Sequence, residues 1–325
     1  MDLLIVESIE PEVMAWLAER HHVHHEPDFA FHPSAFRRAL RGVCAAIVPA
    51  TVAVDAQVLR GAPKLQALGR VSSGAENIDL AACARAGVEV VRSLTATAQA
   101  EAEFTLGCVL ALMRRVPVVG SGGMLVGREL SGSTVGLVGM SGAARSMVQL
   151  LGGFGVRVVG YDPSLHAGDP VWSRWRILPL GLRELLEQSD AVCVQLGDFK
   201  RYHGLLGDRL LPFSKPDQVI VSLSHSSIFD EDALAVALES RRIAAAWFDS
   251  LEPGLLDRGR PLHGIDHLQV TPRLAGTTRE SRLRSAWTVA KRIDELLSLG
   301  PAAPAGFRPS SPGELPVPAG EPALR

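Results

Sequence analysis

Several features that would quickly narrow the function are scarce in this 325-residue sequence. Only 4 of its 33 cationic residues are lysines, and the other 29 are arginines. Because 35 acidic residues bring the formal net charge to -2, the sequence has no basic excess of the kind that predicts nucleic-acid binding. We see no block of like charges that would act as a binding tail.

Long apolar runs and paired cysteines are also lacking. The longest apolar run, 43–54, is interrupted by Pro49 and Thr51, and it falls short of the roughly 18 residues that a membrane span requires. The first residues lack the basic start and long apolar core of a signal peptide. The cysteines are far apart in sequence, which predicts free core thiols in a reducing compartment. They are Cys44, Cys83, Cys108 and Cys193. We therefore expect a cytoplasmic protein that binds neither nucleic acid nor membrane.

Short apolar runs alternate with helical patterns in two successive series. The first series predicts strands at 3–6, 45–48, 65–68 and 88–91, with helices over 12–20, 34–40 and 79–86. After a long predicted helix over 97–115, the second series has strands at 134–138, 157–161, 191–195, 219–222, 244–248 and 268–270, with helices over 142–154, 230–240 and 278–299. Such alternation predicts parallel sheets with crossover helices, and hence an α/β fold with two Rossmann-like domains.

Two further segments stand out by composition. The last 25 residues, 301–325, contain seven prolines and little apolar content, which predicts a disordered tail. The cluster His21-His22-Val23-His24-His25 has enough imidazoles to ligate a metal ion. Histidines on a turn between a helix and a strand are more often solvated, and metal ligands also need groups that orient them. The sequence therefore predicts no bound metal.

The segment after residue 133 has the layout of a dinucleotide-binding βαβ unit. A predicted strand runs into Gly139-Met140-Ser141-Gly142-Ala143-Ala144, and a helical pattern follows at once. The pyrophosphate of a cofactor would bind the amides at the start of that helix, which include those of Gly142 and Ala143. Asp162, 23 residues after Gly139, would accept hydrogen bonds from the ribose hydroxyls, which favours NAD over NADP.

One position departs from this pattern. Ser141 stands where a second glycine normally lets the backbone approach the phosphates. Its side chain would either crowd the cofactor or bond to it. The alternative is a βαβ unit that keeps its shape and has lost the ligand.

Four other segments, together with this unit, resemble the D-isomer-specific 2-hydroxyacid dehydrogenases from about residue 65 to 297. They are 69–79 (GRVSSGAENID), 98–105 (AQAEAEFT), 251–253 (LEP) and 270–278 (VTPRLAGTT). The resemblance implies a catalytic domain, 1–96 with 278–300, that is split by an inserted dinucleotide-binding domain, 97–277. It also implies NAD-dependent interconversion of a small 2-oxo acid and a 2-hydroxy acid, with Ser73 and Gly74 in the loop that binds the substrate carboxylate.

The family's three catalytic residues are all replaced here. His225 occupies the position of the arginine that binds the carboxylate, and Arg273 occupies the position of the histidine that donates the proton. Gly254 stands where a glutamate supports that histidine, and the nearest acid is Glu252. The resemblance also places Asp249 beside the nicotinamide amide, and the predicted cofactor contacts include Ser224.

Three hypotheses follow from these replacements. In the first, His225 and Arg273 have exchanged roles, so that Arg273 binds the substrate carboxylate and His225 donates the proton, with Glu252 as its support. In the second, the chain is a catalytically inactive NAD-binding or interaction protein. In the third, the same cleft performs non-redox chemistry on an acidic substrate. The segment that forms a dimer-contact arm in the family, here within 116–133, is shorter than usual, which leaves a homodimer open.

Overall fold

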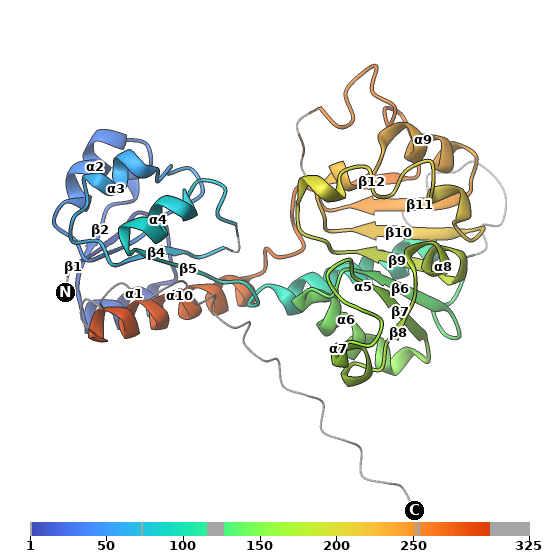
Figure 1. Ribbon diagram of the computed structural model, residues 1–325, viewed down its shortest axis with the longest axis horizontal. Coiled ribbons are helices and arrows are strands. Elements are labelled where there is room, and N and C mark those ends of the chain that lie inside the picture. The colour runs from blue at the N-terminus through green and yellow to red at the C-terminus, as the bar shows by residue number, and fades with distance from the viewer. Residues whose placement is uncertain (1, 73, 116–126, 251, 253, 300–325) are drawn as a thin grey trace, which may run out of the picture. The chain divides into compact units, whose positions relative to one another are not determined.

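The computed structural model describes residues 2–72, 74–115, 127–250, 252 and 254–299. The chain divides into two units, one with the described residues of 1–97 and 279–317 and one with those of 98–278. Each unit contains one fully parallel sheet flanked by helices (Figure 1). The predicted α/β fold with two Rossmann-like domains is therefore confirmed. The predicted tail and residues 116–126 of the shortened segment lie outside the described residues.

The first unit has a five-stranded sheet in the order β2-β1-β3-β4-β5. Its strands are β1 (Asp2–Ile5), β2 (His22–His25), β3 (Ala45–Ile47), β4 (Ala67–Arg70) and β5 (Glu89–Arg92). Its helices are α1 (Pro11–Ala18), α2 (Pro33–Leu40), α3 (Ala56–Arg60), α4 (Leu80–Ala86) and α10 (Arg279–Leu299). The prediction of a turn was wrong for the histidine cluster, because His22–His25 pair with β1 as an edge strand.

Two apolar layers hold the helices of this unit against its sheet. α1 and α10 cover one face, and α2, α3 and α4 cover the other (Figure 1). A Cβ added to Gly69 would lie 2.7 Å from Val289 and 2.8 Å from Ile293, so the glycine is what lets α10 approach β4 closely. The last helix among the described residues therefore completes the core of the first unit.

The second unit has a seven-stranded sheet in the order β12-β11-β10-β9-β6-β7-β8. Its strands are β6 (Thr134–Val138), β7 (Arg157–Tyr161), β8 (Leu178–Pro179), β9 (Ala191–Val194), β10 (Gln218–Ser222), β11 (Ile243–Phe248) and β12 (Leu268–Val270). Its helices are α5 (Ala98–Met113), α6 (Gly142–Leu151), α7 (Pro170–Arg174), α8 (Leu182–Gln188) and α9 (Glu231–Glu239). The strand order reverses between β6 and β9, which is where ligands of doubly wound sheets bind, beyond the carboxyl ends of the strands.

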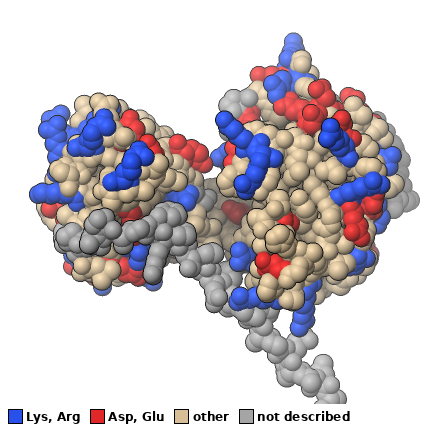
Figure 2. Space-filling view, in the orientation of Figure 1, with Lys and Arg blue, Asp and Glu red and all other residues tan. Residues whose placement is uncertain are grey.

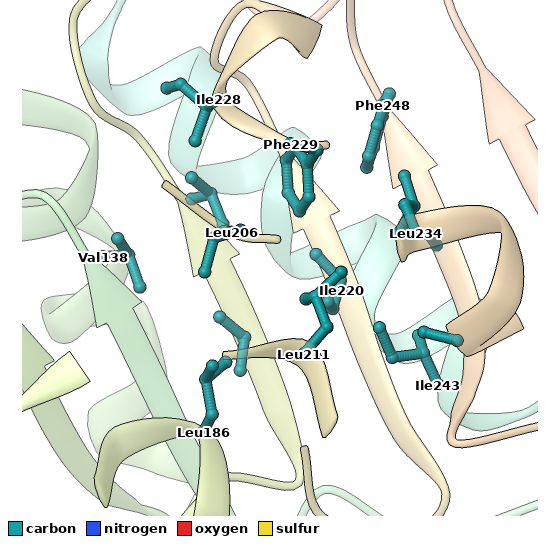
Figure 3. Packing of buried hydrophobic residues seen from close by; sticks show 14 of the residues in the cluster. Val138, Leu186, Leu206, Leu211, Ile220, Ile228, Phe229, Leu234, Ile243 and Phe248 are labelled. Atoms are coloured by element: carbon teal, nitrogen blue, oxygen red, sulfur yellow. The ribbon is translucent and has the colours of Figure 1, made fainter. Parts of the chain in front are cut away.

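The sheet of the second unit is also buried on both faces. α5, α6 and α7 pack on one face, while α8 and α9 pack on the other, where Leu186, Ile220 and Leu234 are fully buried (Figure 3).

The three cysteines buried in the two units are free thiols, and burial raises the pKa of Cys83 to about 11 and that of Cys108 and Cys193 to about 12. These thiols are accordingly poor nucleophiles.

Charges of both signs are mixed on the visible face of each unit, and the helices give no indication of a membrane span among the described residues. Figure 2 shows cationic and anionic side chains interspersed on the visible face of each unit. None of the described helices combines the length and the apolar character needed to cross a bilayer.

Candidate functional site

The glycine-rich turn lies at the point where the strand order of the second unit reverses. Gly139 follows β6 with φ +99, and a Cβ there would lie 2.6 Å from the carbonyl oxygen of Gln195. Only glycine fits both the backbone conformation and this close approach. Backbone hydrogen bonds join the carboxyl ends of β9, β6 and β7 at this turn: Gln195 N donates to Val138 O, and Gly139 N donates to Tyr161 O.

Ser141 is the N-terminal cap of α6. Its hydroxyl oxygen accepts a hydrogen bond from Ala144 N at 3.1 Å, and the hydroxyl donates to Gln195 Oε1 at 2.7 Å. Serine is among the residues that best satisfy the free amides at a helix start. The substitution for glycine therefore has a structural role: the hydroxyl is bound within the turn.

The residues around this turn fit the phosphates of a dinucleotide. The amides of Gly142 and Ala143, at the start of α6, donate to none of the described residues. Gln195 Nε2 is a buried donor that also has no partner among the described residues. Helix N-termini attract anions because the free amides and the helix dipole act together. The turn thus offers three unused donors where the family pattern places a pyrophosphate.

Asp162 lies beside the same turn, at the end of β7. Its Oδ2 accepts from Met140 N at 2.8 Å, and its Oδ1 accepts from both Ser164 N at 2.8 Å and Ser164 Oγ. An ionised carboxylate has about four acceptor sites, so these three bonds leave one site free. Asp162 can accept one ribose hydroxyl as it stands, and a second if Ser164 Oγ turns away.

The predicted residues His225 and Glu252 come together at the carboxyl ends of β10 and β11. His225 Nε2 lies 3.3 Å from Glu252 Oε1, although 27 positions separate the two residues. The same carboxylate oxygen accepts from Ser226 N at 2.7 Å and from Ser250 Oγ at 2.7 Å. Glu252 is therefore held in place beside the imidazole by two short hydrogen bonds.

The other nitrogen of His225 determines the tautomer. Nδ1 lies 3.2 Å from Ser227 N, which can only donate, and 2.9 Å from Ser227 Oγ. In the neutral ring Nδ1 must then accept, so Nε2 carries the proton and donates it toward Glu252. The imidazole is about one-third exposed and Glu252 is largely buried.

Asp249 fixes the loop that carries Arg273. Its two carboxylate oxygens accept from Thr271 Oγ1 at 2.6 Å, from Leu274 N at 2.8 Å and from Ala275 N at 2.8 Å. Arg273 itself adopts φ +54, a left-handed conformation that is uncommon for a residue with a side chain. Its exposed guanidinium donates to none of the described residues, and no ion pair or hydrogen bond joins it to His225 among them.

Ser224, which the sequence placed beside the cofactor, has an internal role in the structure. Its hydroxyl donates to Leu196 O at 3.0 Å and accepts from Leu196 N at 2.8 Å, and the residue is buried. These bonds connect the segments after β9 and β10.

In the first unit, the predicted carboxylate loop contains Ser73, which lies outside the described residues, and Gly74. Sequence reasoning missed two buried charged groups nearby. Arg70, at the end of β4, donates to Asn77 Oδ1 at 2.7 Å and to Ser72 Oγ at 2.6 Å, and its Nε has no partner among the described residues. Burial raises the pKa of Glu7, although a hydrogen bond from the backbone of Val71 and the charge of Arg70 oppose the shift.

These two groups had a partial signal in the sequence. Arg70 lies inside the segment 69–79 that resembles the carboxylate loop, and Glu7 directly follows the first predicted strand. Charged residues at the carboxyl ends of parallel strands lie where such sheets bind ligands. That signal could have singled them out.

The sequence and the fold are similar to those of known proteins. Residues 112–275 match the family model for the NAD binding domain of D-isomer specific 2-hydroxyacid dehydrogenases. An (S)-sulfolactate dehydrogenase from Chromohalobacter salexigens is 31% identical over 79% of this chain and 86% of its own length. A D-3-phosphoglycerate dehydrogenase from Mycobacterium tuberculosis is 31% identical over 77% of this chain, which spans only 48% of that relative.

A solved structure gives the same result for the fold. The NAD+-bound 3-phosphoglycerate dehydrogenase of Entamoeba histolytica aligns with a TM-score of 0.71 at 18% identity, over 92% of this chain and 96% of that one. The family model and the three unused donors at the glycine-rich turn both support NAD as the cofactor.

Proposed function

Because this chain belongs to the D-isomer specific 2-hydroxyacid dehydrogenase family, we propose that it is an NAD-dependent oxidoreductase that interconverts a small 2-oxo acid and the corresponding 2-hydroxy acid. The observation that carries the proposal is the His225–Glu252 pair, 3.3 Å apart, in the unit that also contains the glycine-rich turn. A histidine oriented by a carboxylate is a common arrangement for proton transfer. His225 and Glu252 do not occupy the positions at which the family resemblance places the catalytic histidine and its supporting glutamate.

The chain's own residues hold the cofactor. When bound, NADH supplies the hydride that a carbonyl carbon accepts. The amides of Gly142 and Ala143 and the dipole of α6 would bind the pyrophosphate, and Gln195 Nε2 would donate to it. Asp162 would accept from a ribose hydroxyl with its remaining acceptor site.

His225 supplies the proton. A carbonyl oxygen that gains negative charge during hydride transfer needs a proton, and the imidazolium form of His225 donates it from Nε2, which leaves a neutral ring protonated at Nδ1. The 3.3 Å contact to Glu252 is long for a hydrogen bond, so the proton is not held tightly by the carboxylate. Once Nδ1 is protonated, it no longer accepts from Ser227 N and instead donates to Ser227 Oγ, which lies 2.9 Å away.

Arg273 binds the substrate carboxylate. Its guanidinium is exposed and donates to none of the described residues, so it retains all its donors for a ligand. Guanidinium groups bind carboxylates through two parallel hydrogen bonds, which also orients the substrate. The Asp249 carboxylate fixes the loop and thereby the position from which this side chain extends.

A second candidate is an NAD-binding protein without turnover. It is favoured by the fact that both nitrogens of His225 already have protein partners. Asp249 and Ser224, which the resemblance and the sequence placed at the cofactor, also have internal partners. In this candidate the glycine-rich turn binds the cofactor and no hydride transfer takes place.

Two measurements separate the candidates. Calorimetric titration with NAD, NADH, NADP and NADPH tests the cofactor, with saturable NADH binding expected. NADH oxidation at 340 nm across a panel of 2-oxo acids tests turnover, which we expect to fall by about 10²–10⁴ in His225→Ala and also to fall in Arg273→Ala. His203→Ala is the matched control, because His203 pairs with Asp198 at 3.1 Å elsewhere in the same unit. NADH binding with no turnover on any 2-oxo acid would favour the second candidate.

A further inference from the structure

A cluster of three side chains in the first unit contains none of the residues of the candidate functional site. His22 and His24 are two positions apart on β2, so their side chains lie on the same face of the sheet. Asp2 lies beside His22 in the parallel pairing of β1 with β2. One side-chain N or O atom from each of the three residues lies within 4.8 Å of the other two.

Both imidazoles are directed at the same carboxylate oxygen. Asp2 Oδ1 is 2.9 Å from His22 Nδ1 and 3.7 Å from His24 Nε2. Around a tetrahedral zinc ion with bonds of about 2.0–2.1 Å, ligand atoms are about 3.3–3.4 Å apart. The two distances lie on either side of that value, so movements of about 0.4 Å would bring each nitrogen to this separation from Asp2 Oδ1, and the third pair of atoms already lies within 4.8 Å.

The cluster is accessible and its rings are mutually oriented. The side chains of Asp2, His22 and His24 are 47%, 73% and 42% exposed, so an ion from solution can reach them and water can complete its coordination. The two imidazoles pack edge to face with their centroids 4.5 Å apart. That packing limits the orientations that each ring can adopt.

We propose that Asp2, His22 and His24 form an open binding site for a divalent transition-metal ion, of which Zn²⁺ is the representative. Two imidazoles and one carboxylate suit zinc, nickel or copper, whereas calcium and magnesium prefer oxygen ligands. Because the ligands come from two strands, the ion connects the edge strand β2 to β1. The sequence alone predicted no metal, since it placed these histidines on a turn and did not bring Asp2 to them.

Calorimetric titration of the untagged, chelator-treated full chain with zinc chloride tests the site. We expect one saturable site, weakened at least about tenfold in His22→Ala/His24→Ala, which removes both imidazole ligands, and in Asp2→Asn, which replaces the anionic carboxylate by a neutral amide. His25→Ala is the matched control: it lies on the same strand, where it pairs with Ile5, but on the opposite face. This control should bind zinc as the unmodified chain does.

Thermal unfolding gives a second readout. Zinc should raise the midpoint of the unmodified chain and of His25→Ala, and should leave that of His22→Ala/His24→Ala unchanged, because an ion that binds the folded state stabilises it. Cupric ion should bind more tightly than zinc. The proposal is overturned if zinc shows no saturable binding, or if the double variant binds zinc as tightly as the unmodified chain.

Discussion

Replacing Glu252 with glutamine is a direct test of the histidine–carboxylate pair. Glu252 Oε1 accepts from Ser226 N and Ser250 Oγ, both at 2.7 Å, and lies 3.3 Å from His225 Nε2. Glutamine keeps an acceptor oxygen and removes the charge, and a hydrogen bond to a charged group contributes about 1.5–3 kcal/mol against about 0.5–1.5 kcal/mol for a neutral one. Since two short bonds each weaken by about 1 kcal/mol, we expect the free energy of unfolding to fall by about 2 kcal/mol.

The effect on catalysis should be larger than the effect on stability. General acid–base groups contribute about 10²–10⁴ in rate, so we expect kcat/KM for a 2-oxo acid to fall about 100-fold in Glu252→Gln. The calorimetric Kd for NADH should not change, because Glu252 is not among the cofactor contacts. Urea denaturation measures the first effect, and NADH oxidation at 340 nm measures the second.

Ser250→Ala is the control for this experiment. It removes one 2.7 Å hydrogen bond to the same oxygen and leaves the carboxylate beside His225. We expect it to lose stability and to retain most of its kcat/KM. An unchanged kcat/KM in Glu252→Gln would refute the role of the carboxylate, and an equal loss in both variants would show that loop position, and not charge, controls the rate.

Two further predictions concern the second unit. Gly139→Ala forces a Cβ to within 2.6 Å of Gln195 O at φ +99. We therefore expect at least about tenfold weaker NADH binding by calorimetry and a free energy of unfolding about 1–3 kcal/mol lower. The control is Gly152→Ala, where a Cβ meets nothing within 4 Å, and it should change neither quantity. Burial alone would raise the pKa of Asp190, but its bonds to Lys215, the amide of Thr134 and Arg128 outweigh burial and lower it. The carboxylate therefore stabilises the fold at neutral pH, and this contribution is lost as the pH falls below the ordinary value of 3.8 toward the lowered pKa. Asp190→Asn should cost about 2 kcal/mol at pH 7 in urea denaturation and much less at pH 2, and an equal cost at both pH values would contradict this assignment.

Local pattern predicted much of the fold because local chemistry determines it. The strands β6, β7 and β12 begin and end where the sequence predicts, since each is a short apolar run between a turn and a helix or loop. The short elements α3, α7, α8 and β8 were not predicted. Five-residue helices such as α3 and α7 depend on tertiary contacts, because so short a segment has little helical stability of its own.

The candidate site was predicted less completely, for a different reason. Position in the sequence identified His225 and Glu252, but their contact depends on how the segments after two neighbouring strands fold back, which no local pattern encodes. The same holds for Asp249 and Ser224, whose partners lie more than 20 positions away. The cluster at Asp2 and His22 likewise depends on the register of β1 with β2.

The placement of α10 has a consequence for biosynthesis. The second unit is continuous in sequence, over 98–278, so all its strands have been synthesised before the first residue of α10 is added. All five strands of the first unit have been synthesised once Arg92 is added. One face of their sheet, however, is covered fully only when Val289 and Ile293 on α10 have been made. During translation the part of the first unit before residue 98 therefore keeps an apolar surface uncovered while the 181 residues of 98–278 are made. Exposed apolar sheet faces promote aggregation, so this interval is when the nascent chain most needs protection by chaperones.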